Sequence, residues 1–168
     1  MLGHGAQVNA KDDAGRTSLM YSIIQNHDDV VQKLAESGAD FEMKDTFGDN
    51  ALIYCAIFGR AKAADYLIKK GANIEAKDAF DETPLLVCSS RDRLETLRAL
   101  IENGANIEVK NKEGWTALLI ASQKKSEYKA EAFMGLLPVP VVKEKKKASK
   151  PKKQTGEAEE YVFFGIND

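Results

Sequence analysis

The sequence contains few cysteines, histidines and prolines, and this shortage excludes several classes of protein. Its 168 residues include 2 cysteines, 2 histidines and 4 prolines. Cys55 and Cys88 form no Cys-x-x-Cys pair, so the sequence indicates neither a disulfide scaffold nor a thiolate metal site. Metal binding and nucleophilic catalysis need several converging histidine, cysteine or carboxylate groups, and His4 and His27 do not supply such a group. We therefore expect no enzyme active site, no cofactor and no bound metal.

The sequence also lacks a long apolar run and a secretory leader. One of its longest apolar stretches, 135–142, contains two prolines and is far shorter than the roughly 20 residues that cross a bilayer. The amino end shows no basic region followed by an apolar one, which is the pattern of a signal peptide. We therefore expect no transmembrane segment and a reducing setting, either cytosolic or nuclear.

Charge is distributed unevenly along the chain, although the net charge is only −2. Residues 143–153 hold seven lysines and one glutamate, and residues 154–168 hold four acidic residues and no basic one. The stretch 143–157 has almost no apolar residues, so we expect it to be disordered. The segment 161–166 is again apolar and aromatic, which is typical either of a docking peptide or of a chain end without a role.

The chain repeats itself with a period of 33 residues. Gly-Ala pairs begin at residues 5, 38, 71 and 104, and Asp or Asn opens a similar segment at residues 12, 45, 78 and 111. These segments read DDAGRTSL, DTFGDNAL, DAFDETPL and NKEGWTAL. A constant period of this length indicates stacked copies of one structural unit.

Each unit contains two short helical patterns. In the second unit, apolar residues recur at three-and-four spacing over 51–58 and 61–69, with Gly59 between the two stretches. Gly71 is expected to end the second helix with a positive φ. Helices this short are marginal in water, so each unit must cover the apolar face of its neighbour. Close approach of successive helices is permitted by four small residues at one repeat position: Ser22, Cys55, Cys88 and Ala121.

The repeat resembles the ankyrin repeat, which has a 33-residue period and a Thr-Pro-Leu-His-x-Ala signature. Thr83, Pro84 and Leu85 match this signature, and the resemblance extends over about residues 1–137. Asp81 departs from the pattern because a turn glycine is expected there. The signature histidine is replaced by Met20, Ile53, Leu86 and Leu119. The resemblance implies an all-α ankyrin-repeat solenoid of stacked helix-turn-helix units with a disordered C-terminal tail.

The register of the repeat divides the chain into successive segments. They are the end of a truncated repeat at 1–11, ankyrin repeats at 12–44, 45–77 and 78–110, a C-terminal capping repeat at 111–137, and a flexible tail at 138–168 with a basic block at 143–153 and an aromatic end at 161–166.

The first complete repeat is expected to expose apolar side chains, because residues 1–11 supply no helices to cover it. The side chains concerned are Leu19, Met20, Ile23 and Ile24. Contiguous exposed apolar surface usually marks an interaction site, so we expect upstream repeats, a second copy of the chain or the segment 161–166 to cover it. We accordingly predict self-association through this uncapped first repeat.

The resemblance implies that a partner binds at the tips of the turns and on the exposed side of the first helices. By register, the candidate partner-binding residues are Arg16, Phe47, Asp49, Phe58, Phe80, Glu82, Arg91 and Trp115. Three of them are large aromatic residues at turn positions where the fold needs no side chain, and interface hot spots favour aromatic residues and arginine. The alternative is that each ring packs on the adjacent turn.

These observations predict a protein–protein interaction module or scaffold that binds an unidentified protein. The alternative function is an adaptor that binds nucleic acid or a membrane surface through the lysine-rich block 143–153. This block has no interleaved aromatic residues, so a solvated linker is the better interpretation and nucleic acid is the less favoured partner. The salt dependence of binding distinguishes the two functions, because binding to phosphate weakens steeply as ionic strength rises.

Overall fold

The structure is a computed structural model that describes residues 7–123 and Gly135. Three features expected from the sequence lie outside the described residues, apart from Gly135. They are the second helix of the capping repeat at 127–136, the basic block at 143–153 and the aromatic end at 161–166.

The described residues form seven α-helices and no strand. The helices are α1 (Ser18–Ile24), α2 (Asp28–Glu36), α3 (Ala51–Phe58), α4 (Ala61–Lys69), α5 (Pro84–Arg91), α6 (Leu94–Glu102) and α7 (Ala117–Gln123). The first six fall as pairs within the intervals 12–44, 45–77 and 78–110. The expected all-α repeat fold is therefore confirmed.

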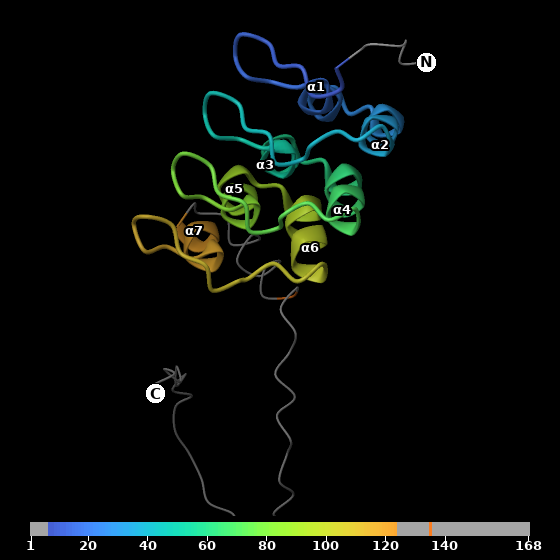
Figure 1. Cartoon of the computed structure of the whole chain (residues 1–168). Helices are drawn as coiled ribbons and strands as arrows, with labels where there is room; N and C mark the ends of the chain where they lie inside the picture. Colours follow the sequence, from blue (N-terminus) through green and yellow to red (C-terminus); the bar gives the residue numbers. More distant parts are fainter. Residues whose placement is uncertain (1–6, 124–134, 136–168) are drawn as a thin grey trace, which may run out of the picture. The chain divides into compact units, whose positions relative to one another are not determined.

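The helices form two parallel rows within residues 7–123. The inner row consists of α1, α3, α5 and α7, each packed on the next, and the outer row consists of α2, α4 and α6. Figure 1 shows the long turns projecting from the inner row, one above another, on the side away from the outer row. Each helix pair therefore stacks on its sequence neighbours, as a repeat of constant period requires.

The inner helices begin after polar residues at one repeat position. Thr17 and Asn50 precede α1 and α3, and both side chains are buried. Thr17 Oγ1 accepts a hydrogen bond from the N–H of Met20 at 3.4 Å, and Asn50 Oδ1 accepts one from Ile53 at 3.0 Å. Such caps satisfy N–H groups that have no partner inside the helix, so local sequence fixes where these helices start.

Arginines join the end of one inner helix to the start of the next outer helix. Arg60 donates to the carbonyl oxygens of Ile23 and Ile24 at 3.0 and 2.7 Å, and Arg93 donates to that of Ile57 at 3.1 Å. The last carbonyls of a helix lack partners within it, so these arginines satisfy them across the repeat boundary. Neighbouring repeats are therefore held together by polar contacts as well as by apolar packing.

The core contains buried residues from the helices of both rows. The four small residues at one repeat position are buried, with exposed fractions between 0% for Cys55 and 5% for Ser22. Cys55 and Cys88 are free thiols, and burial raises the pKa of both above the ordinary thiol value. They act as small buried hydrophobic residues, as the sequence predicts.

The expectation that the first repeat exposes its apolar residues is wrong for three of the four residues named. Leu19, Met20 and Ile23 are each 1% exposed and belong to the common core, and Ile24 is half-buried against it. The reason is that α1 packs on both α2 and α3, and these two contacts cover the apolar side of so short a helix. The surface on which the prediction of self-association depended is therefore absent at these three residues.

Candidate functional site

The turns that carry the candidate residues are built around an acidic or amide side chain. Asp45 Oδ1 accepts hydrogen bonds from the N–H groups of Phe47 at 2.8 Å and Asp49 at 2.9 Å. One repeat later, Asp78 Oδ1 accepts the same two bonds, from the N–H groups of Phe80 at 2.8 Å and Glu82 at 2.9 Å. Equivalent bonds occur in the first and fourth turns. These bonds form an Asx-turn, which fixes the backbone of the candidate residues themselves.

The fourth residue of each turn has a left-handed backbone. Gly48 has φ +82°, and a Cβ built there would lie 2.7 Å from the backbone nitrogen of Ala79 in the next turn. Asp81 keeps the same conformation with φ +68°, although a side chain is present. Aspartate tolerates this region better than most residues, so the departure of Asp81 from the glycine pattern leaves the turn intact.

Successive turns are bonded to one another. The N–H of Thr46 donates to the carbonyl of Ala14 at 3.0 Å, and the N–H of Ala79 donates to that of Phe47 at 3.2 Å. Lys112 reaches back to the carbonyl of Ala79 at 3.1 Å. The turn tips are therefore linked in series by hydrogen bonds, which presents side chains from neighbouring repeats in a row.

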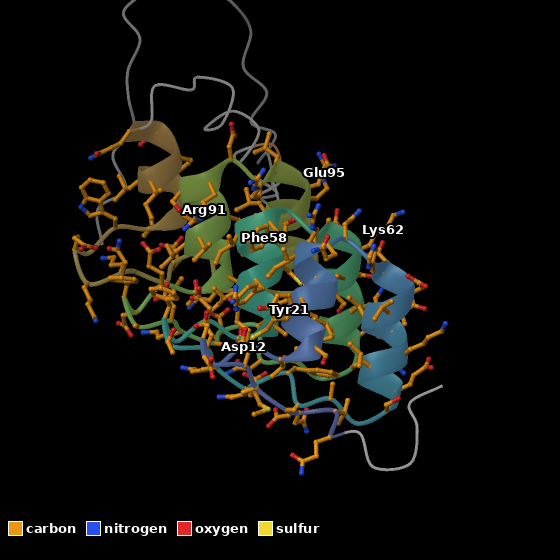
Figure 2. All side chains as sticks on the ribbon, turned by 90° about the horizontal axis from the view of Figure 1, so that it is seen from above. Asp12, Tyr21, Phe58, Lys62, Arg91 and Glu95 are labelled. Atoms are coloured by element: carbon orange, nitrogen blue, oxygen red, sulfur yellow. The ribbon has the colours of Figure 1, made fainter. Side chains whose placement is uncertain are left out.

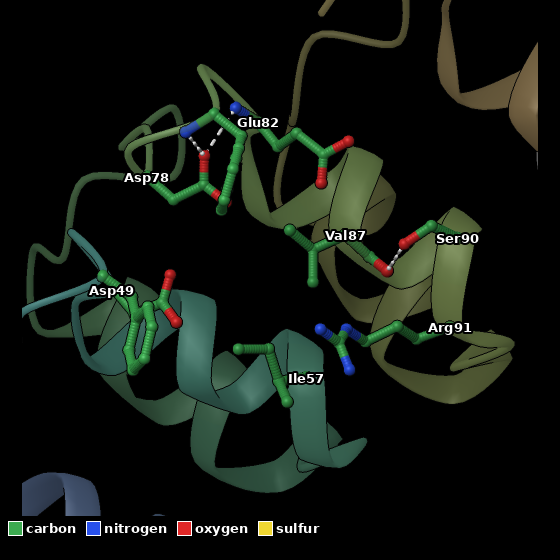
Figure 3. Close-up of a pocket in the computed structure, with 9 residues that line it drawn as sticks. Asp49, Ile57, Asp78, Glu82, Val87, Ser90 and Arg91 are labelled. Atoms are coloured by element: carbon green, nitrogen blue, oxygen red, sulfur yellow. Dashed lines mark hydrogen bonds between the residues drawn. The ribbon is translucent and has the colours of Figure 1, made fainter.

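A groove of about 280 Å³ lies between the second and third turns and the inner helices behind them (Figure 3). We call it the acidic groove. It is lined by Phe47, Asp49, Ile57, Asp78, Phe80, Glu82, Val87, Ser90 and Arg91. Five of the eight residues expected from the sequence thus meet in one place: Phe47, Asp49, Phe80, Glu82 and Arg91.

The two phenylalanine rings of the acidic groove are largely exposed. Phe47 is 65% and Phe80 67% exposed, although both belong to turns whose backbones are tightly bonded. Rings that pack on the adjacent turn would lose most of their accessible surface. The interpretation of these rings as structural packing is therefore not supported, and they remain available for contact with another molecule.

Carboxylates dominate the charge of the acidic groove. Burial, followed by the nearby carboxylates of Asp45 and Asp78, raises the pKa of Asp49 from 3.8 to about 6, against the opposing effect of Arg91. Burial and then Asp78 also raise the pKa of Glu82, against the opposing effects of the Asn111 side chain and, more weakly, Arg91. Three carboxylates and one guanidinium line the groove, so acidic groups outnumber basic ones there.

A change of residue type at one repeat position creates space in the third repeat. In the second repeat, the hydroxyl of Tyr54 donates to Oδ2 of Asp45 at 2.8 Å, and the first repeat contains the same bond. Val87 occupies this position in the third repeat, so it gives Asp78 no such hydrogen bond. Val87 and Asp78 both line the groove instead. The exchange of tyrosine for valine leaves a cavity with a carboxylate at its edge.

A second pocket of about 310 Å³ continues the groove toward the fourth repeat. Its lining includes Trp115, which is 37% exposed, and it shares Glu82 and Ser90 with the acidic groove. The two pockets are therefore adjacent, with Glu82 and Ser90 in the lining of both. Trp115 therefore lies on the same face as Phe47 and Phe80.

The structure places Arg16 and Phe58 outside the acidic groove. Arg16 pairs with Asp12 at 3.1 Å, and its guanidinium lies 4.9 Å from the ring centroid of Tyr21. Phe58 stacks on Tyr54, with ring centroids 6.0 Å apart. Figure 2 shows Phe58 at the end of its inner helix remote from Asp12, and it lines a separate pocket there. Both side chains have structural partners in this fold.

Several residues of the groove were not among the candidates expected from the sequence. The repeat pattern identifies Asp78 only as the residue that opens a turn, and it gives no indication of a role for Val87. The signal that could have revealed them is the loss of tyrosine at position 87, because the same position holds tyrosine in both preceding repeats. Register alone does not show that this change opens a cavity.

Within residues 7–123, no group of three or more histidine, cysteine, aspartate or glutamate side chains is arranged to hold a metal ion. No helix in that part of the chain is long and apolar enough to cross a membrane.

Comparison with known families agrees with this geometry. A family model described as ankyrin repeats (3 copies) matches residues 1–78, and another described as ankyrin repeats (many copies) matches residues 86–127. The chain belongs to the ankyrin-repeat family. A comparison with curated proteins found no match. Ankyrin repeats are in general protein–protein interaction modules.

Proposed function

We propose that this protein binds a partner protein through the acidic groove and its continuation toward Trp115. The observation that carries the proposal is the pair of exposed rings, Phe47 and Phe80, on the rim of a groove whose backbone is rigidly bonded. Exposed aromatic side chains next to a concave surface are what interface hot spots require. A rigid backbone reduces the entropy lost on binding.

The alternative function, an adaptor acting through residues 143–153, depends on a segment outside the described residues. No feature of residues 7–123 favours it. Self-association through the first repeat also lacks support, because Leu19, Met20 and Ile23 are buried in the core. The groove between the second and third turns is therefore the better-supported binding surface.

The double variant Phe47→Ala and Phe80→Ala tests the proposal. Affinity capture from the native source should recover partners with the unchanged chain and lose them, by tenfold or more, with the double variant. Helix content and melting should stay nearly unchanged, since both rings are mostly exposed and contribute little to packing.

The matched control is Val30→Ala, an exposed apolar side chain on α2 in the outer row. This variant should retain every partner that depends on the groove. Equal loss of partners in both variants would contradict the proposal. A drop in stability of several kcal/mol in the double variant would show that the rings are structural.

A further inference from the structure

We propose that the acidic groove takes a lysine or arginine side chain from an extended segment of the partner, with the cation near Asp49, Asp78 and Glu82. This inference rests on the proposed function, because it names the chemistry of the partner at that same surface. Two independent features define the docking surface before charge is considered, namely the cavity and the exposed rings on its rim. Charge complementarity then selects the occupant.

The size of the cavity suits a single side chain. Pockets that enclose whole small ligands span about 300–1,000 Å³, and this groove of about 280 Å³ lies just below that range. It is also open at the turn side, where Phe47 and Phe80 stand exposed. One long side chain can enter while the backbone to which it belongs stays on the rim.

Three carboxylates from two repeats line this cavity (Figure 3). Asp49 comes from the second turn, whereas Asp78 and Glu82 come from the third. Asp78 has no tyrosine hydroxyl on its second oxygen, unlike the aspartates of the first two turns. Half-buried carboxylates are stabilised by a nearby cation. Burial is the main cause that raises the pKa of both Asp49 and Glu82, so a cation that enters the groove would offset part of the cost of burying their charge.

The aromatic rim adds a second preference for a cation. A lysine or arginine that crosses the face of Phe47 or Phe80 gains cation–π attraction, and its apolar stem covers the exposed rings. An acidic side chain would meet repulsion from the same carboxylates. A purely apolar side chain would leave the carboxylates buried without a partner, which is unfavourable.

Arg91 defines the direction of the bound segment. It closes α5, at the end of the groove away from the turns, and its guanidinium points into the groove beside Ile57 (Figure 3). A guanidinium carries five N–H donors and no acceptor. It therefore suits backbone carbonyls of an extended segment, while the cationic side chain of that segment lies among the carboxylates nearer the turns.

Fluorescence anisotropy with labelled peptides tests the inference on the full chain. The probe is a twelve-residue peptide of alternating lysine and serine, and the comparison peptides carry acetyl-lysine or glutamate in place of lysine. The lysine peptide should bind at least about tenfold more tightly than either comparison peptide, a ratio that corresponds to a single well-placed charge contact.

Two double variants that each remove two negative charges, one in the groove and one away from it, locate the binding site. The groove variant Asp49→Asn with Glu82→Gln should weaken lysine-peptide binding by at least about tenfold. The control variant Glu36→Gln with Glu102→Gln removes the same charge from the ends of α2 and α6 and should change binding by less than about twofold. Equal effects of the two variants, or equal binding of the acetylated peptide, would overturn the inference.

The basic block of the chain itself is the competing occupant. Replacing the seven lysines of 143–153 by glutamine should leave peptide affinity within about twofold if the groove serves a partner. A rise of tenfold or more would assign the groove to this block and overturn the assignment to a partner. Loss of captured partners in the Phe47 and Phe80 variant without any binding of the lysine peptide would refute this inference alone. Peptide binding without partner loss would refute the proposed function.

Discussion

Leu67 lies at the centre of the stack, on α4, with none of its side chain exposed. Leu67→Ala removes three carbons from a site enclosed by neighbouring helices, so we expect a loss of about 2–5 kcal/mol in the free energy of unfolding. Urea denaturation of the full chain measures it. Leu119→Ala makes the same chemical change at a side chain that is 48% exposed, and should cost less than about 1 kcal/mol. Similar losses in the two variants would mean that burial does not govern the effect.

Asp49 makes the stability of the fold depend on pH. Its pKa is about 6 in the folded chain because of burial and the carboxylates of Asp45 and Asp78, which outweigh Arg91. A carboxyl with a raised pKa holds its proton more tightly in the folded state than in the unfolded state. The free energy of unfolding should therefore fall as pH rises from about 4, where the carboxyl is protonated in both states, through about 6, where it ionises in the folded state.

Asp49→Asn should accordingly raise the melting temperature at pH 7.5, because amide nitrogen and oxygen carry no net charge to desolvate. Below about pH 4 the gain should vanish, since the aspartate is then protonated in both states. Thermal unfolding followed by circular dichroism at several pH values measures the difference. Asp29→Asn, an exposed change on α2, controls for net charge. An unchanged or lower melting temperature of Asp49→Asn at pH 7.5 would contradict the assigned electrostatics.

The starts of the inner helices differ in how well they are capped. Asn50 is fully buried and precedes α3. Its Oδ1 caps this helix by accepting a hydrogen bond from the N–H of Ile53, and its Nδ2 donates to Glu42 Oε2 at 3.0 Å. Thr83 occupies the same position before α5, but its buried hydroxyl has no hydrogen-bond partner among the described residues. The same repeat position is therefore a stabilising cap in one unit and a buried polar group without a partner in the next.

Asn50→Ala should destabilise the chain by roughly 0.5–2 kcal/mol through loss of the cap. Thr83→Val keeps the shape and removes only an unpaired hydroxyl, so it should be neutral or stabilising. Chemical denaturation of both variants beside the unchanged chain measures the contrast. A loss in Thr83→Val as large as that in Asn50→Ala would show that the Thr83 hydroxyl is bonded in solution.

The stack as a whole should not be uniformly stable. Among the described helices, α3 and α5 pack on inner helices on both sides, whereas α1 and α7 do so on one side. Because the stability of stacked repeats comes largely from their interfaces, backbone amides of α3 and α5 should exchange with solvent more slowly than those of α1 and α7. Hydrogen exchange followed by mass spectrometry measures this order. Equal protection in all four helices would indicate a single cooperative unit.

The sequence alone determined the architecture and the placement of the turns. The 33-residue period specified the helix pairs, and the aspartate or asparagine that opens each turn, together with Gly59 and Gly71, marked the ends of the elements. These features are local, because caps and turns are made by residues a few positions apart. Since each repeat is related to the next by nearly the same translation, register also identified Phe47 and Phe80 as neighbours on one edge.

Only the tertiary structure decided which candidate residues share a groove and which surfaces are exposed. It separated Phe58 and Arg16, which have ring or carboxylate partners, from the residues of the acidic groove. It also buried Leu19, for which the sequence predicted exposure. The repeat register predicts the backbone position of each residue. The direction that its side chain takes and the space around that side chain depend on side chains of the adjacent repeats, such as the valine at position 87, and this packing is determined only when the repeats are stacked.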